Sequence, residues 1–461
     1  MGQIKRYNQS AFPGAAAYAE LHARSAFSML DGAALPETLA RRAAELGLSA
    51  IALTDLDDVG GAVRFAEACA EHGVRPIFGA ELSLAEAGRA PVVLLCEDLE
   101  GWSNLCTLIT RARADSPRGE PASSLERLAA RARGLVCLGG GTEGAVARSP
   151  ALAGPLAEIF AGRFYLEVHD HARHDDARRG AETIALARRL GVPWVVTSDA
   201  RHASHDDKLV HDALRCLLHE RTLASAGELL FPNASRRVRS PSALASIFAG
   251  APEGLARTLE VAERAALDLV RDARFSLPQF QFTDGTVAGD DHLAALAREG
   301  LRERGSTSAH EAQLAHELAV VRRLGLAGFF LVVWDLVRFA RSRAILAQGR
   351  GSAANSVLCY ALGITAVDPV RGGLLFERFL SEGRAGAPDV DLDVAHRDRE
   401  EVLQYLYARW GREHAAMVCE TIAWRAKSAV RDAARVLGLS AELGDRLARE
   451  VASAVAHDGP R

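Results

Sequence analysis

The stretch Pro388-Asp389-Val390-Asp391-Leu392-Asp393-Val394 alternates three carboxylates with three apolar side chains. Side chains of a strand alternate between its two faces, so a strand here would present all three aspartates on one face. Aspartate is depleted in strands, and three on one face repel each other unless a cation lies between them. A pair of hard divalent cations such as Mg²⁺ fits this arrangement. An acidic edge strand or a solvated turn is the alternative interpretation.

A second motif lies upstream, in the sequence Gln-Gly-Arg-Gly-Ser-Ala-Ala-Asn-Ser of residues 348–356, which we call the glycine loop. Its glycines let the backbone approach a ligand closely. Ser352 can cap the helix expected to follow, whose free N–H groups would point at a phosphate, and Arg350 adds a bidentate phosphate donor. The Gly-Lys-Ser/Thr ending of an ATPase loop is missing. A plain turn is the alternative.

Together, the two motifs indicate a function more specifically than either motif does alone. Nucleotidyl transfer needs donors for a triphosphate and carboxylates for two metal ions that flank the reacting phosphorus. Further along, residues 401–407 and 426–432 have amphipathic helical patterns, and Arg425, Lys427 and Arg431 recur at helical spacing. This spacing predicts that the three side chains line a path for DNA or for a triphosphate. A solvated helix face is the alternative for each of them.

The composition is that of an ordinary globular protein, with 49% apolar and 25% charged residues. A length of 461 residues predicts two or three domains. No apolar run is long enough to span a membrane, and no signal-peptide core follows Met1, so we expect a cytoplasmic protein. The seven cysteines are scattered without CxxC spacing, which favours reduced thiols over a zinc site. A net charge of −4 argues against a basic DNA-coating protein but allows a local basic channel.

In the first half of the chain, short apolar runs alternate with helical patterns such as residues 36–46. Strands are predicted at residues 19–22, 50–55, 75–81, 92–96, 135–139, 164–168 and 192–199. This alternation predicts a mainly parallel sheet, and the number of units favours a β/α barrel. Functional residues of such barrels lie at the C-terminal ends of the strands. There the sequence places His22, Asp55, Glu81 and Asp199.

The residues around these positions resemble the PHP (polymerase and histidinol phosphatase) domain. Its first motif is present as His22-Ala23-Arg24-Ser25 with Leu30-Asp31-Gly32, and its Thr-Asp-His-Asp motif as Thr54-Asp55-Leu56-Asp57. The glutamate motif is Phe78-Gly79-Ala80-Glu81, and the late Asp-x-His motif is Asp199-Ala200-Arg201. Metal-binding members of the family hold a trinuclear cluster with histidines and acids. The resemblance therefore implies a phosphoesterase-like face.

The departures from the family pattern are informative. Arg24, Leu56 and Arg201 stand where the resemblance implies histidine ligands, and Pro91 and Gly141 take two further ligand positions. An arginine cannot lose its proton to bind a metal, and its charge repels one. The possible ligands that remain are His22, Asp31, Glu81 and Asp199. We expect a PHP domain without metal or hydrolase activity, in which Arg24 and Arg201 pair with Asp31, Glu81 or Asp199.

Other histidines occur at His169, His171 and between His202 and His211. They fall in a predicted polar connection and at a helix start, without the paired spacing of a helical metal site. A solvated surface is therefore expected for them, with a structural role for His202.

The second half resembles the palm of C-family bacterial DNA polymerases. The glycine loop continues into Val357-Leu358-Cys359-Tyr360-Ala361-Leu362-Gly363-Ile364-Thr365. The segments Leu374-Leu375-Phe376-Glu377-Arg378-Phe379-Leu380 and Pro388-Asp389-Val390-Asp391-Leu392-Asp393 follow in family order. Gln348 and the Ala-Ala-Asn-Ser form of the loop resemble the error-prone branch of the polymerase III alpha subunits, as does the pairing of this palm with a degenerate PHP domain.

Carried over by position, the resemblance implies that Asp389 and Asp391 are the metal-binding catalytic aspartates. Gly351 and Ser352 would hold the phosphates of the incoming nucleotide, with Arg350 nearby. Asp393 would lie outside the catalytic pair. The implied domains are a loose arm at residues 1–18, a PHP-like β/α barrel at 19–274, a linker at 275–291, a partial mixed α+β palm at 292–420 and the start of a helical thumb at 421–461.

The implied function is template-directed DNA synthesis from dNTPs on primer-template DNA. The resemblance implies two Mg²⁺ ions in the palm, with Mn²⁺ as an alternative, and an error-prone, translesion role in DNA damage tolerance. The sliding clamp and other translesion factors would bind through regions beyond this chain. Because the family's third catalytic aspartate lies further downstream, we expect this chain alone to be an incomplete polymerase. The alternatives are an inactive module that binds partners through its PHP domain, and a PHP phosphoesterase.

Overall fold

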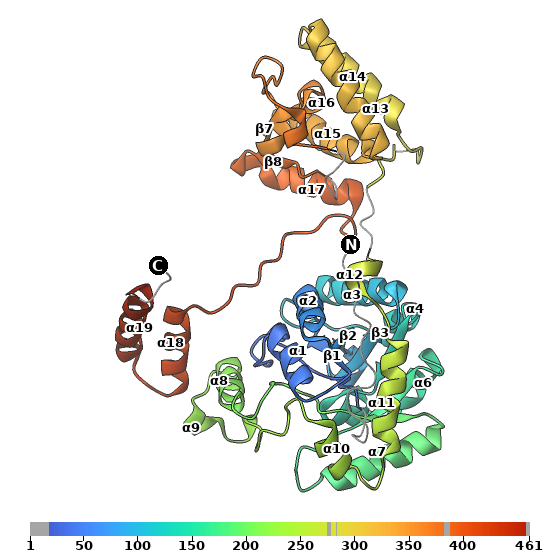
Figure 1. Ribbon diagram of the computed structural model, residues 1–461, viewed down its shortest axis with the longest axis vertical. Helices are drawn as coiled ribbons and strands as arrows, with labels where there is room; N and C mark the ends of the chain where they lie inside the picture. The colour runs from blue at the N-terminus through green and yellow to red at the C-terminus, as the bar shows by residue number, and fades with distance from the viewer. Residues whose placement is uncertain (1–17, 274–277, 283, 382–387, 458–461) are drawn as a thin grey trace. The chain divides into compact units, whose positions relative to one another are not determined.

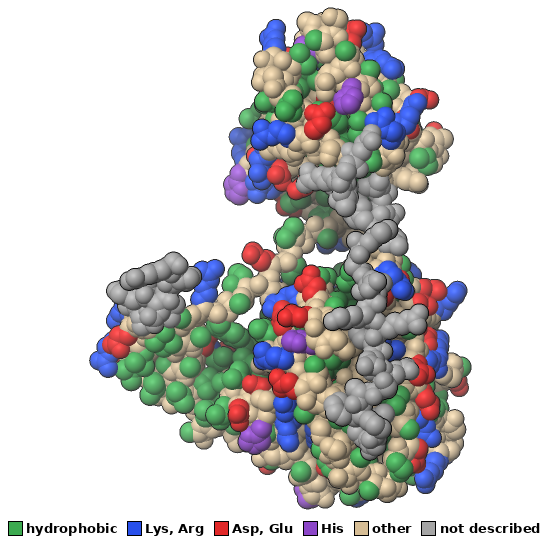
Figure 2. All heavy atoms as spheres, viewed as in Figure 1, with side chains coloured by type: hydrophobic (Ala, Val, Ile, Leu, Met, Phe, Trp, Pro, Cys, Tyr) green, Lys and Arg blue, Asp and Glu red, His purple; other side chains and the backbone are tan. Residues whose placement is uncertain are grey.

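The computed structural model describes residues 18–273, 278–282, 284–381 and 388–457 (Figure 1). Contacts divide the chain into two compact units, residues 1–273 with 423–461 and residues 274–422. Almost all of the predicted arm and part of the predicted linker lie outside the described residues. Within the described residues, no helix is long and apolar enough to cross a membrane. On the face of the first unit drawn in Figure 2, acidic and basic side chains are interspersed.

The first unit is built on a six-stranded sheet whose strands follow one another in chain order. The strands are β1 (Ala50–Leu56), β2 (Arg75–Ser83), β3 (Pro91–Cys96), β4 (Leu135–Leu138), β5 (Phe164–Val168) and β6 (Trp194–Val196). The predicted first strand at residues 19–22 forms only isolated bridges, but it connects both edges of the sheet. Glu20 bridges to Ile51 of β1, and Ala23 bridges to Ala200, which follows β6. The sheet therefore curls into the predicted barrel.

The strand directions depart from a uniform parallel barrel at β3. The pairs β1–β2, β4–β5 and β5–β6 are parallel, whereas β3 runs antiparallel to both β2 and β4. The connection from β2 to β3 contains only the short 3₁₀ turn Ala85–Ala87. A parallel pair needs a crossover of a dozen or more residues, so this short connection forces the chain to turn back.

Helices cover the sheet, and both faces are buried. As predicted, α1 (Pro36–Glu45) has proline at its first turn and ends before Gly47, whose φ is +73°. Alternate residues of β1 contribute to different cores: Ile51 packs with Phe65 and Leu39, and Ala52 packs with Val261 of α11. The other helices of this unit are α2 (Ala62–His72), α3 (Leu99–Asp115), α4 (Leu125–Ala130), α5 (Ala145–Arg148), α6 (Ala153–Ile159), α7 (Asp176–Leu190), α8 (Lys208–Leu218), α9 (Leu223–Ala226), α10 (Pro241–Ile247), α11 (Glu253–Arg264) and α12 (Leu269–Asp272).

The tail of the chain also belongs to the first unit. Helices α18 (Ala426–Val436) and α19 (Ala441–His457) form a hairpin. Val436 of this hairpin packs with Cys216 of α8 and Ala226 of α9. The segment predicted as the start of a thumb therefore contacts the barrel unit.

The second unit packs helices around a two-stranded antiparallel sheet. Its elements are α13 (Asp290–Glu303), α14 (Ser308–Arg323), α15 (Ala327–Ser342), β7 (Ala347–Arg350), α16 (Val357–Ala361), β8 (Asp391–Val394) and α17 (Arg399–Trp410). Phe330 of α15 lies in its core with Phe376 and Phe379. Strand β7 begins at Ala347, after Ala344, whose left-handed φ of +56° does not fit a strand.

Candidate functional site

The acidic stretch and the glycine loop are brought together by the pairing of β7 with β8. Arg350 lies opposite Asp391, and Gln348 lies opposite Asp393. Asp391 and Asp393 are exposed, whereas Leu392 between them is half-buried against the core of the second unit. Asp389, which precedes the strand, is exposed as well. The alternation predicted from the sequence is thus confirmed, with the carboxylates facing solvent.

Arg350 forms an ion pair with each of the two acids on β8. Its Nε donates to Oδ1 of Asp393 over 3.1 Å, and its Nη1 lies 3.4 Å from Oδ2 of Asp391. The guanidinium is 58% exposed, and pairs of this kind stabilise a fold by about 0–1 kcal/mol. A stronger cation can therefore displace Arg350 at little cost to the fold.

The glycine loop leaves β7 through a left-handed turn. Gly351 has a φ of +65° and lies beside Oδ2 of Asp391, which a Cβ at this position would approach to 3.7 Å. A 3₁₀ helix, Gly351–Asn355, follows and contains Ser352. The predicted cap is wrong: Ser356 caps α16 by accepting from the N–H of Cys359, because the 3₁₀ turn separates Ser352 from the helix.

The sequence also predicted free N–H groups at the start of α16. In the structure the first two of these groups are occupied. The N–H groups of Val357 and Leu358 donate to the buried carboxylate of Glu317 on α14. Sequence reasoning missed Glu317, because a single glutamate in a helical pattern carries no signal for such a role.

Lys427 and Arg431 do not belong to the same unit as this site. Both lie on α18 of the first unit, whereas Arg350 and Asp391 belong to the second. Arg431 instead forms an exposed ion pair of 2.6 Å with Asp445 of α19. Their contact with DNA or a triphosphate stays a prediction.

A second group of polar residues fills the C-terminal end of the barrel. We call it the barrel cluster and define it as His22, Arg24, Asp31, Glu81, Glu167, His169, Asp199, Arg201 and Arg236, all of them buried. Arg24 donates to both oxygens of Glu81 and to Asp31. Arg201 donates to Asp31 and, over 2.8 Å, to Asp199. The ion pairs predicted for these two arginines are confirmed.

His22 lies between two carboxylates. Its Nδ1 is 2.7 Å from Glu167, and its Nε2 is 2.7 Å from Glu81. Burial lowers the pKa of His22, but the charges of Glu167, Glu81 and Asp199 outweigh it and raise that pKa well above its usual value. The two flanking carboxylates therefore favour the protonated form of His22.

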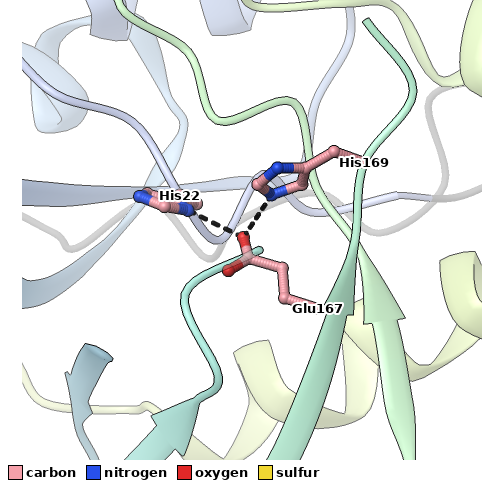
Figure 3. Close-up of side chains that lie close together, drawn as sticks. All are labelled: His22, Glu167 and His169. Carbon is pink, nitrogen blue, oxygen red and sulfur yellow. Dashed lines mark hydrogen bonds and ion pairs between the residues drawn. The ribbon is translucent and has the colours of Figure 1, made fainter. Parts of the chain in front are cut away.

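Residues that sequence reasoning missed complete the cluster. His169 and His171 are buried, so the predicted solvated surface is wrong for them. Figure 3 shows His22 and His169 on either side of Glu167, with His169 Nε2 2.9 Å from the carboxylate. Glu167 and His169 sit at the end of β5, the position where a barrel presents functional residues, and that signal was available.

Three sets of side chains here have donor atoms close enough together to hold a metal ion. They are His22 with Glu167 and His169, His169 with His171 and Asp199, and His22 with Glu81 and Asp199. Cationic side chains also lie against these acids. The guanidiniums of Arg24, Arg201 and Arg236 and the ring of His22 face the carboxylates of Asp31, Glu81, Glu167 and Asp199. Whether the barrel holds a metal ion stays a prediction.

Asp55 is not part of this arrangement. Its carboxylate accepts the N–H and hydroxyl groups of both Ser25 and Ser28. Burial raises the pKa of Asp55 to about 6, although these hydrogen bonds act in the opposite direction. Asp55 thus fixes the loop after His22 instead of facing the barrel cluster. His202, also buried, has its Nδ1 2.7 Å from the carbonyl of Ser204.

Comparison with known families defines the class. The PHP domain model matches residues 20–171, and the model of the bacterial DNA polymerase III alpha NTPase domain matches residues 291–458. An error-prone DNA polymerase of Anaeromyxobacter dehalogenans is 40% identical over 95% of this chain and 46% of its own length. One of Mycolicibacterium paratuberculosis is 42% identical over 95% of this chain and 42% of its own length. The chain therefore combines a PHP domain with a bacterial DNA polymerase III alpha domain, and it is similar to error-prone DNA polymerases along most of its length.

The chain spans about half the length of these relatives. Among solved structures, an amidohydrolase of Chromobacterium violaceum aligns with 41% of this chain and 89% of its own, at 18% identity and a TM-score of 0.32. That likeness is too weak to support an argument about the site.

Proposed function

We propose that the protein carries the nucleotide-transfer centre of a DNA-directed DNA polymerase of the error-prone, translesion type. It would add dNTPs to the 3′-hydroxyl of a primer on template DNA. The observation that carries the proposal is the pairing of β7 with β8, which sets the glycine loop beside exposed carboxylates. Nucleotidyl transfer needs both parts at one place.

Asp389 and Asp391 would hold the divalent cations, with Mg²⁺ as the physiological ion and Mn²⁺ as an alternative. Both side chains suit this role, because their carboxylate oxygens are exposed and such oxygens are the ligands that Mg²⁺ prefers. When bound, the ions would lower the pKa of the attacking hydroxyl and stabilise the leaving pyrophosphate.

The chain's own residues would bind and orient the triphosphate. Arg350, held to Asp391 and Asp393 by exposed contacts, can turn its guanidinium to the phosphates once those acids bind cations. Gly351 leaves room for close approach, and Ser352 supplies a hydroxyl donor. Lys427 and Arg431 would contact the phosphates of the DNA.

Primer extension tests the proposal. The protein is incubated with Mg²⁺, a primer-template and each dNTP in turn, and only the nucleotide complementary to the template should be added. Equal addition of all four dNTPs would contradict a templated reaction. Because a further region can be required for turnover, Mn²⁺ binding is measured in parallel by electron paramagnetic resonance, and absence of binding would overturn the metal assignment.

For the barrel we propose a PHP domain that holds no metal and hydrolyses no phosphoester. The support is the balance of charge in the barrel cluster, where arginines and His22 take the positions of cations. Metal analysis after dialysis with Zn²⁺ or Mn²⁺, together with a p-nitrophenyl phosphate assay, tests this. Stoichiometric metal that is lost in a His169→Ala variant would contradict it.

A further inference from the structure

Glu317, on α14, is a fully buried carboxylate that the proposed chemistry does not use. One oxygen accepts from Val357 N–H over 2.9 Å and from the amide of Gln313 over 3.1 Å. The other accepts from the Ser356 hydroxyl over 2.7 Å and from Leu358 N–H over 2.9 Å. All four donors are uncharged, so dipoles alone stabilise the anion.

These contacts tie the far end of the glycine loop to α14. The near end is fixed by the β7–β8 ladder, where Arg350 lies opposite Asp391. Between the two anchors lies the 3₁₀ helix Gly351–Asn355. Since the carboxylate occupies the first N–H groups of α16, those donors are withheld from a triphosphate, and the loop itself must supply them.

We propose that Glu317 is the positioning residue of the nucleotide site: by holding Ser356 and the start of α16, it fixes the Gly351–Asn355 turn beside the acidic strand so that the turn can receive the phosphates of a dNTP. This inference rests on the proposed function. Glu317 itself touches neither nucleotide nor metal.

The arrangement requires a carboxylate rather than an amide. Glutamine has nearly the same shape, but its NH₂ group would face Val357 N–H or Leu358 N–H, a donor against a donor. Ser356 would be disturbed as well, because its hydroxyl donates to Glu317 while accepting from Cys359 N–H at 3.1 Å. The cap of α16 and the position of the loop therefore change together.

The test compares Glu317→Gln with Glu311→Gln, an exposed glutamate on the same helix. Binding of dATP with Mg²⁺ is measured by equilibrium dialysis, and amide hydrogen exchange is followed over residues 351–358. Loss of a hydrogen bond to a buried charge predicts at least about tenfold weaker dATP binding and faster exchange in Glu317→Gln only. Exchange in the barrel unit should stay unchanged.

Glu317→Asp, which keeps the charge on a shorter side chain, should recover part of the dATP affinity and covers the case in which Glu317→Gln fails to fold. Wild-type binding of dATP that survives unchanged in Glu317→Gln would overturn this inference and leave the proposed function intact. A wild-type protein that binds no dATP would overturn the proposed function and the nucleotide role of Glu317 with it.

Discussion

The barrel cluster and the acidic strand both gather carboxylates, but they neutralise them in opposite ways. In the barrel, Glu81, Asp31 and Asp199 are buried, and arginines of the same chain pair with each of them. On β8, Asp391 and Asp393 are exposed and share one exposed arginine. A buried acid needs a permanent partner, because an unpaired charge away from water is costly. An exposed acid can exchange its partner.

The difference teaches that one chain can hold acids in two ways, with buried permanent partners in the barrel and with an exposed, exchangeable partner on β8. Guanidiniums fixed inside the barrel make its acids structural. The acids of β8 keep a weak, replaceable cation, so they stay available to metal ions and a nucleotide. Four predictions can break or sharpen this contrast.

The largest effect is expected for Asp391→Asn. In the proposed function Asp391 would hold a metal ion, so its removal should lower nucleotide incorporation by about 10³-fold or more, equivalent to about 4 kcal/mol of transition-state stabilisation. The fold should be unaffected because the side chain is exposed. Asp393→Asn is the matched control on the same face, and single-nucleotide primer extension is the measurement. Equal losses in both variants would contradict the assignment.

In the barrel, Arg201→Met should reduce the free energy of unfolding by about 3–5 kcal/mol, since it leaves Asp31 and Asp199 buried without this partner. Arg178→Met, which breaks an exposed pair with Glu182 on α7, should cost about 1 kcal/mol or less. Urea denaturation monitored by circular dichroism measures both. A cost for Arg201→Met as small as that for Arg178→Met would show that the barrel cluster is not held by these pairs.

Asp55 provides a pH-dependent effect of intermediate size. Because its folded pKa of about 6 lies above the ordinary value of 3.8, its stabilising contribution is complete below pH 3.8 and is lost as the pH rises through 6. The wild type should therefore lose about 3 kcal/mol relative to Asp55→Asn between these limits. Unfolding free energies of both proteins at pH 4.5 and pH 8 measure most of the change, and a constant difference between them would refute it.

The smallest change in stability is expected for Arg350→Ala. Its pairs with Asp391 and Asp393 are exposed, so the free energy of unfolding should fall by less than about 1 kcal/mol. Mn²⁺ binding to the acidic strand should become tighter, because the competing guanidinium is gone. Weaker Mn²⁺ binding in this variant would mean that Arg350 supports the metal site instead of competing for it.

Much of this contrast could be predicted from the sequence. The alternation of residues 388–394 gave the correct faces of β8, because a period of two is a local property of strands. The arginines at 24 and 201 could be paired with acids because an unpaired guanidinium is not tolerated in a barrel interior. The antiparallel direction of β3 was missed although its signal was available, because the link between the strands predicted at 75–81 and 92–96 is too short for a parallel crossover.

The errors have a common physical source. His169 and His171 look like surface residues because polar neighbours surround them in sequence, whereas their burial depends on contacts with distant segments, such as Glu167 with His22. Ser352 and Ser356 are equally good caps in isolation, and only the intervening 3₁₀ turn selects Ser356. Glu317 was missed because its partners lie in another helix.

The close approach of Gly141 to His169 has a consequence for substitutions at both positions. Gly141 has a φ of +58°, and a Cβ placed there would lie 1.9 Å from the His169 ring. No larger side chain can therefore be placed at position 141 unless the ring of His169 moves away first. The residues that positions 141 and 169 can carry therefore depend on each other.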